Sequence, residues 1–179
     1  KPEIDDGMIL LSDVMQVKRG IATGAKDWFV GNLSKFNDFP YSVLTPCISK
    51  ASDINQASIQ DRALSYKSNF DKYIISPNDS KICQDYIALG ESQGLHQRYL
   101  TRNRKKWYSI NLPRIPDAFI NVFTRKEFYI LENILRAQSL SCFHYVYLKD
   151  NIDIYKYNDF IMGKDFHKSA EIVMKKYGG

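Results

Sequence analysis

Small residues break up the stretch Arg19-Gly20-Ile21-Ala22-Thr23-Gly24-Ala25, which Trp28-Phe29-Val30 follows two residues later. A run of small residues between a basic segment and an aromatic one is typical of a tight strand-turn-strand connection. Gly20 and Gly24 can adopt positive φ or allow close backbone approach, and Thr23 can bond a backbone group or a phosphate. The stretch therefore predicts either a structural hairpin or a turn that lies near a ligand.

A second motif lies downstream and combines cations with aromatic side chains. Five cations fall within nine residues and precede Trp107-Tyr108: Arg98, Arg102, Arg104, Lys105 and Lys106. No acidic residue occurs between Glu91 and Asp117. This density suits phosphate contacts, and the alternative is a solvated charged face. We expect Trp107 and Tyr108 to be core anchors of a strand rather than stacking platforms for bases.

The first half of the chain is predicted to hold short strands, loops and one clear helix. Short strands are expected from Ile9 to Val30. Prolines predict irregular backbone at residues 31–50, and polar composition predicts a surface excursion at 51–72 with at most one short helix. An N-cap at Asp79-Ser80 indicates a helix that ends at Gly90, and residues 95–104 can extend it.

The second half is predicted to be mostly strands, with a helix at its end. Composition predicts four strands, at residues 107–110, 119–123, 128–131 and 143–148. Apolar residues then recur at helical spacing from about Asp159 to Tyr177. The expected fold class is therefore α+β, with short strands dominating.

Composition limits the classes of protein that fit. A length of 179 residues with 44% hydrophobic residues suits one globular domain, and no apolar run approaches the roughly 20 residues of a membrane helix. A net charge of +5 favours a polyanionic partner. Three cysteines, Cys47, Cys83 and Cys142, are too few and scattered for a disulfide framework, which favours a cytoplasmic location. Because the start at Lys1 has neither an initiator Met nor the order of a secretion signal, we expect the chain to be a fragment.

Four blocks of the sequence, taken in order, resemble the C-terminal specificity domain of TaqI-like adenine-N6 DNA methyltransferases. They are the first motif with Trp28-Phe29-Val30, then Asp85-Tyr86-Ile87-Ala88-Leu89-Gly90, then Arg98-Tyr99, and last Arg104-Lys105-Lys106-Trp107-Tyr108. That family includes fused type II restriction-modification enzymes. The resemblance runs from about Val14 to Tyr147, and the end at Lys175–Gly179 is similar to the start of the family's last helical segment.

The resemblance implies that the chain is a single target recognition domain over residues 1–179. Residues 1–158 would be strand-rich, with short strands in an irregular double sheet or β-helix-like core. Residues 159–179 would begin a terminal helical hairpin.

The resemblance also implies a function, which is recognition of a DNA sequence for a site-specific adenine-N6 methyltransferase of a restriction-modification system. S-adenosylmethionine would bind in a catalytic domain outside this chain, and no cofactor is expected within it. The expected partners are double-stranded DNA, which would hold the protein on the nucleoid, and the missing N-terminal catalytic domain.

The expected DNA contacts are basic residues and the small residues of the first motif. They are Lys18, Arg19, Thr23, Gly24, Lys26, Arg98, Arg102, Arg104, Lys105, Lys106 and Arg114. Loop residues able to read base edges are Asn32, Asn55, Gln56, Gln60, Arg62 and Arg114.

Two other functions stay open. One is the DNA-binding module of a phage-defence methyltransferase that needs partner subunits. The other is a stand-alone enzyme that uses Asp38, His96 or Cys83, although the histidines and cysteines match no metal or nucleophile template. Asp38-Phe39-Pro40-Tyr41 differs from the family's catalytic motif, because Phe39 replaces the first of two prolines that present acceptors to a flipped adenine.

Overall fold

The computed structural model describes residues 11–54, 61, 63–65, 71–122 and 129–149. Short elements alternate along these residues. In chain order they are α1 Leu11–Val14, β1 Met15–Arg19, α2 Lys26–Phe29, β2 Val30–Asn32, η1 Tyr41–Val43, β3 Leu44–Ile48, η2 Ala51–Asp53, β4 Lys72–Ile75, α4 Lys81–Ser92, η4 Leu95–Gln97, α5 Tyr99–Arg102, β5 Ala118–Asn121, β6 Ile130–Glu132, β7 Gln138–Ser139 and β8 Phe143–Leu148. The predicted α+β class is confirmed.

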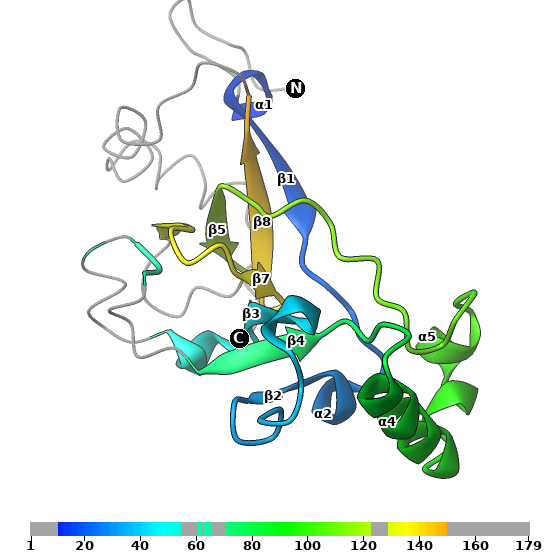
Figure 1. Ribbon diagram of the computed structural model, residues 1–179. Coiled ribbons are helices and arrows are strands. Elements are labelled where there is room, and N and C mark those ends of the chain that lie inside the picture. The colour runs from blue at the N-terminus through cyan, green and yellow to red at the C-terminus, as the bar shows by residue number, and fades with distance from the viewer. Residues whose placement is uncertain (1–10, 55–60, 62, 66–70, 123–128, 150–179) are drawn as a thin grey trace, which may run out of the picture.

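The described strands form two four-stranded sheets (Figure 1). The first sheet has the order β1-β8-β5-β6 and is antiparallel throughout. The second has the order β2-β4-β3-β7, in which only the β3–β7 pair is parallel. In Figure 1 the long strands β1 and β8 stand above the second sheet, and α4 and α5 lie to one side of it. The arrangement matches the expected double sheet of short strands.

A cluster of buried side chains lies where the two sheets meet. Ile48 of β3 belongs to the same cluster as Phe119 of β5 and Phe143 and Tyr145 of β8, and all four are at most 1% exposed. The Tyr145 hydroxyl donates to the Ser139 carbonyl at 2.7 Å and accepts from the Ser139 amide at 2.9 Å, so its burial leaves no polar group unpaired. Burial of each large side chain contributes about 1.5–3 kcal/mol.

The predicted strand-turn-strand unit is wrong. β1 and β2 belong to different sheets, and residues 20–25 carry the chain from one sheet to the other. After β1 the Gly20 amide bonds the Phe143 carbonyl at 3.2 Å, so the backbone continues along the same neighbour instead of turning back. Trp28 and Phe29 belong to the one-turn helix α2, and both rings are buried. In a strand, successive side chains point to opposite faces, so the two rings would not share one buried side.

Predictions for the other elements had mixed outcomes. The strand expected at 143–148 is confirmed in full as β8. The strands expected at 119–123 and 128–131 are confirmed in part, as β5 and β6. The strand expected at 107–110 is wrong, because the chain turns there and the Ser109 amide bonds the Lys106 carbonyl at 2.9 Å. The irregular backbone expected at 31–50 is interrupted by β2 and β3, and β4 begins within the expected excursion. Pro46 is tolerated in β3 because only β4 pairs at that position.

The helix expected after an N-cap at Asp79-Ser80 is confirmed as α4, which begins at Lys81 after Ser80, but its end differs. It runs to Ser92, and Gly94, with φ of 70°, takes the left-handed position that ends a helix. The expected extension over 95–104 is two separate short helices, η4 and α5. The helix expected at 159–177, and with it the terminal hairpin at 159–179, lies outside the described residues. No described helix is long and apolar enough to cross a bilayer.

Candidate nucleic-acid interface

Three aromatic side chains join α2, α4 and the segment after α5. The Trp28 ring stacks on Tyr86 at 4.6 Å between centroids and lies 4.8 Å from Trp107. The Tyr86 hydroxyl donates to the Trp28 carbonyl at 2.7 Å, and Trp107 Nε1 donates to Glu91 Oε1 at 3.0 Å. Trp107 is 9% exposed, and Tyr108 packs against the same core. Both are core anchors as expected, although neither lies in a strand.

Gly90 sets how closely α4 approaches this aromatic cluster. A Cβ atom built at Gly90 would lie 2.4 Å from Trp107 Cη2 and 2.8 Å from Trp28 Nε1. No side chain fits at that distance, so Gly90 is a packing residue and not the predicted helix stop.

Arg104 ties the two sequence motifs together. Its Nη2 donates to the carbonyls of Ala22 at 3.0 Å and Thr23 at 2.8 Å, and its Nη1 donates to the Trp107 carbonyl at 3.3 Å. The guanidinium also lies 5.4 Å from the Phe29 ring centroid. Partial burial lowers the pKa of Arg104. A residue expected to hold phosphate thus directs three hydrogen bonds into the protein.

Thr23 is buried and Gly24 is half-buried at this junction. Thr23 is 5% exposed. Gly24 has φ of 77°, and a Cβ atom built on it would lie 2.7 Å from Leu100 Cβ. These two residues and Arg104 hold the turn at residues 22–25 against α5, so their placement suits support of an interface more than direct contact.

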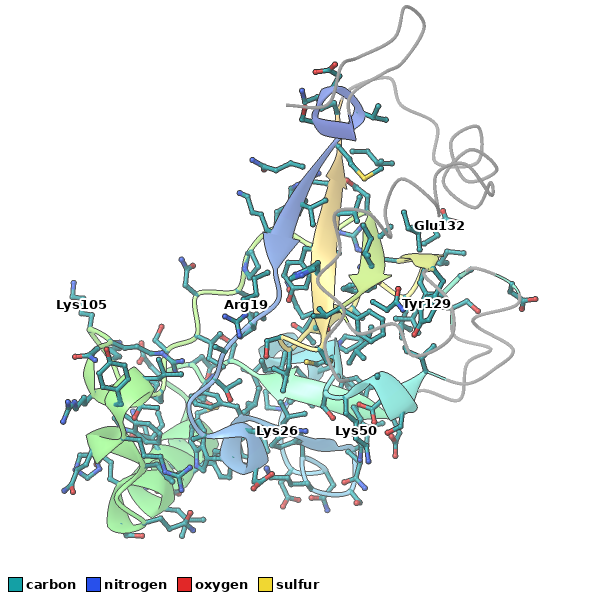
Figure 2. The ribbon with its side chains drawn as sticks, turned by 180° about the vertical axis from the view of Figure 1, so that it is seen from behind. Arg19, Lys26, Lys50, Lys105, Tyr129 and Glu132 are labelled. Atoms are coloured by element: carbon teal, nitrogen blue, oxygen red, sulfur yellow. The ribbon has the colours of Figure 1, made fainter. Side chains whose placement is uncertain are left out.

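The other expected contact residues are exposed cations. They are Lys18 and Arg19 on β1, Lys26 on α2, Arg98, Arg102 on α5, Lys105, Lys106 and Arg114. Within the described part of the chain, only two of them have a carboxylate oxygen within 4 Å, Lys106 from Asp79 at 3.9 Å and Arg114 from Asp117 at 3.2 Å. Figure 2 shows Arg19, Lys26 and Lys105 on three different parts of the fold. Several separate segments therefore supply exposed cations that no described carboxylate pairs.

The residues expected to read base edges are only partly described. The Asn32 carboxamide oxygen accepts from Ser34 Oγ at 2.9 Å and the Lys35 amide at 3.2 Å, so it shapes its own loop. Arg114 lies 4.9 Å from the Tyr147 ring, and the Tyr147 hydroxyl donates to its carbonyl. Asn55, Gln56, Gln60 and Arg62 lie outside the described residues.

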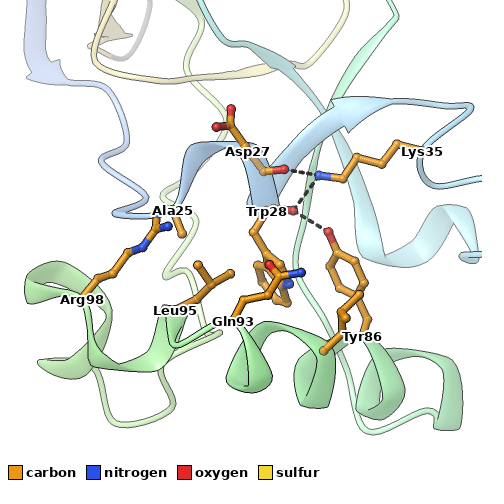
Figure 3. Close-up of a pocket in the computed structure, with 9 residues that line it drawn as sticks. Ala25, Asp27, Trp28, Lys35, Tyr86, Gln93, Leu95 and Arg98 are labelled. Carbon is orange, nitrogen blue, oxygen red and sulfur yellow. Dashed lines mark hydrogen bonds between the residues drawn. The ribbon is translucent and has the colours of Figure 1, made fainter.

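A pocket of about 270 Å³ lies between α2 and α4 (Figure 3). Lys35 reaches into it, and its Nζ donates to the carbonyls of Asp27, Trp28 and Val30. Desolvation by burial lowers the pKa of Lys35, and the nearby Asp27 opposes that effect. The sequence did not predict Lys35 at the site. Its hydrogen-bond partners are backbone carbonyls in and beside α2, a segment that was expected to be a strand.

The three residues that a stand-alone enzyme would use do not contact one another through a hydrogen bond or ion pair among the described residues. Cys83 is fully buried in α4, Asp38 is exposed before η1, and His96 lies in η4. No hydrogen bond or ion pair links any two of them among the residues that the structure describes. Over the same residues, no group of three metal-ligating side chains occurs.

Two comparisons with known proteins identify the family of this chain. A family model described as the C-terminal domain of type II methyltransferase M.Eco57I matches residues 3–179. The type II methyltransferase M.AccI of Acinetobacter calcoaceticus is 31% identical over 143 residues, which are 76% of this chain and 26% of M.AccI. The chain thus spans about a quarter of the length of that curated relative. Both matches agree with the resemblance carried by the motifs.

Proposed function

Because the chain belongs to the family of the C-terminal domain of type II methyltransferase M.Eco57I, we propose that it is a DNA target recognition domain. It binds duplex DNA and selects the site at which a restriction-modification methyltransferase modifies adenine at N6. The protein would then act in the cytoplasm, on the nucleoid.

The catalytic steps are proposed to occur outside this chain. A domain elsewhere in the protein would bind S-adenosylmethionine and receive the flipped adenine. The described residues contain no parallel β-α-β unit with a glycine-rich loop, which is the arrangement that commonly cradles such a nucleotide-like cofactor. The share of M.AccI that the chain leaves uncovered is large enough for such a domain.

The observation that supports DNA binding best is the Arg104 junction beneath exposed cations. Arg104 fixes the turn at 22–25 to the segment that carries Arg98, Arg102 and Lys105. Arg98, Arg102 and Lys105 are exposed, and no described carboxylate lies within ion-pair distance of them. Each cation placed on a phosphate releases condensed counterions, so a group of exposed cations favours a polyanion.

The test is the salt dependence of binding to duplex DNA. Full-length protein that carries this chain should bind a labelled duplex with an affinity that falls steeply between about 50 and 200 mM salt. Lys105→Ala should weaken binding to every sequence and reduce the slope of log affinity against log salt by about 0.9. Fluorescence anisotropy measures both quantities.

The matched control is Lys81→Ala. Lys81 is exposed but lies 2.6 Å from Asp85 on the same helix, so its loss should leave the slope unchanged. Absence of duplex binding at low ionic strength would contradict the proposed function. An unchanged slope for Lys105→Ala would remove that residue from the phosphate contacts.

A further inference from the structure

The one-turn helix α5 presents two apolar side chains to solvent. Tyr99 is 71% exposed and Leu100 is 43% exposed, whereas the next residue, Thr101, is fully buried. Figure 1 shows α5 beside α4, away from the strands of the first sheet. Single exposed apolar residues are common, but two large ones that adjoin on one short helix favour a contact surface.

The backbone beneath these side chains is firmly anchored. The Thr101 hydroxyl donates to the carbonyls of Leu95 and Arg98, and Asn103 Nδ2 donates to the Tyr99 carbonyl at 2.7 Å. On the other side, Gly24 allows the turn at residues 22–25 to approach Leu100. Tyr99 and Leu100, which we call the α5 tip, therefore project from a rigid support.

Cations flank the α5 tip along the chain. Arg98 and Arg102 lie on either side of it in sequence, and the Arg102 guanidinium lies 5.6 Å from the Tyr99 ring centroid. Lys105 follows, and no acidic residue occurs between Glu91 and Asp117. An apolar centre with a cationic rim is complementary to nucleic acid, in which bases lie between two lines of phosphates. An ordinary protein surface lacks that regular negative charge.

We propose that the α5 tip inserts against the base stack of duplex DNA as a wedge, while Arg98, Arg102 and Lys105 contact the flanking phosphates. This inference rests on the proposed function and adds the residues that deform the duplex. Partial unstacking by apolar wedges kinks DNA, and a weakened stack lowers the cost of extruding a nearby base.

The test compares two duplexes of the same sequence, one fully paired and one with a single mismatched base pair. Full-length wild-type protein should prefer the mismatched duplex, because its stack is already weakened. Tyr99→Ala should lose that preference and bind the paired duplex about 10-fold more weakly, the scale of one lost base–aromatic contact. Its salt slope should stay at the wild-type value, since no cation is removed.

Tyr41→Ala is the matched control, because Tyr41 is a tyrosine of similar exposure, 74%, that belongs to η1 and not to α5. It should bind both duplexes as wild-type protein does. If Tyr99→Ala also bound both as wild type does, the wedge would be overturned and the proposed function would stand. A lower Tm for Tyr99→Ala with unchanged DNA affinity would overturn it too, since the tip would then pack on another part of the protein. If wild-type protein bound neither duplex, both proposals would fail.

Discussion

Arg104 shows how far one residue's role depends on its distant neighbours. It lies within a run of cations, yet its guanidinium meets two carbonyls of residues more than 80 positions earlier in the chain. A pattern of charges along the sequence indicates a basic surface, but it cannot indicate which cation turns inward. That choice depends on where the turn at residues 22–25 lies in the fold.

Arg104→Lys tests this role directly. A lysine ammonium keeps the charge but lacks the planar fork that reaches three carbonyls at once. We expect the free energy of unfolding to fall by about 2 kcal/mol, the scale of hydrogen bonds to a charged group. Urea denaturation measures it, and Lys105→Ala, an exposed neighbour, should change stability by less than about 0.5 kcal/mol. A stability for Arg104→Lys equal to that of wild-type protein would show that the junction contributes nothing.

At the scale of elements, local signals explain which predictions were confirmed. α4 has an N-cap signal and apolar residues on one face, and β8 is rich in aromatic residues and includes the β-branched Val146, so both could be predicted. α2, β2 and β4 are only three or four residues long. The conformations of these short elements depend on partners elsewhere in the chain. β3 was not predicted because it includes Pro46, a residue that disfavours strands.

The helix α4 also offers a test of element packing. An alanine in place of glycine usually stabilises a helix interior by about 0.5–1 kcal/mol. Gly90→Ala should instead destabilise by about 1–3 kcal/mol, because the new methyl group overlaps the Trp107 and Trp28 rings. Thermal unfolding followed by tryptophan fluorescence measures the change. Ala88→Gly, at an exposed position of the same helix, should cost about 1 kcal/mol by propensity alone. A stabilised Gly90→Ala variant would contradict the packing of α4 on the aromatic cluster.

At the scale of the whole molecule, the chain crosses from the first sheet to the second at residues 20–25, where Arg104 also attaches the basic segment. Both motifs are visible in the sequence and indicated the family. The sequence did not predict that Arg104 of the second motif bonds the backbone of the first. Nor did it predict the pocket beside Lys35, because both features arise from long-range packing. The candidate interface is thus a product of tertiary structure, assembled from motifs that are individually visible in the sequence.

The proposed role in site selection belongs to this scale and has one direct test. Full-length protein is expressed in a methylation-free host, and the host genome is read for N6-methyladenine. The segment that corresponds to this chain is then exchanged for the matching segment of M.AccI, and the genome is read again. We predict that the parent methylates one short sequence throughout, and that the methylated sequence changes with the exchanged segment. A methylated sequence that stays the same after the exchange, in an enzyme that remains active, would contradict the account.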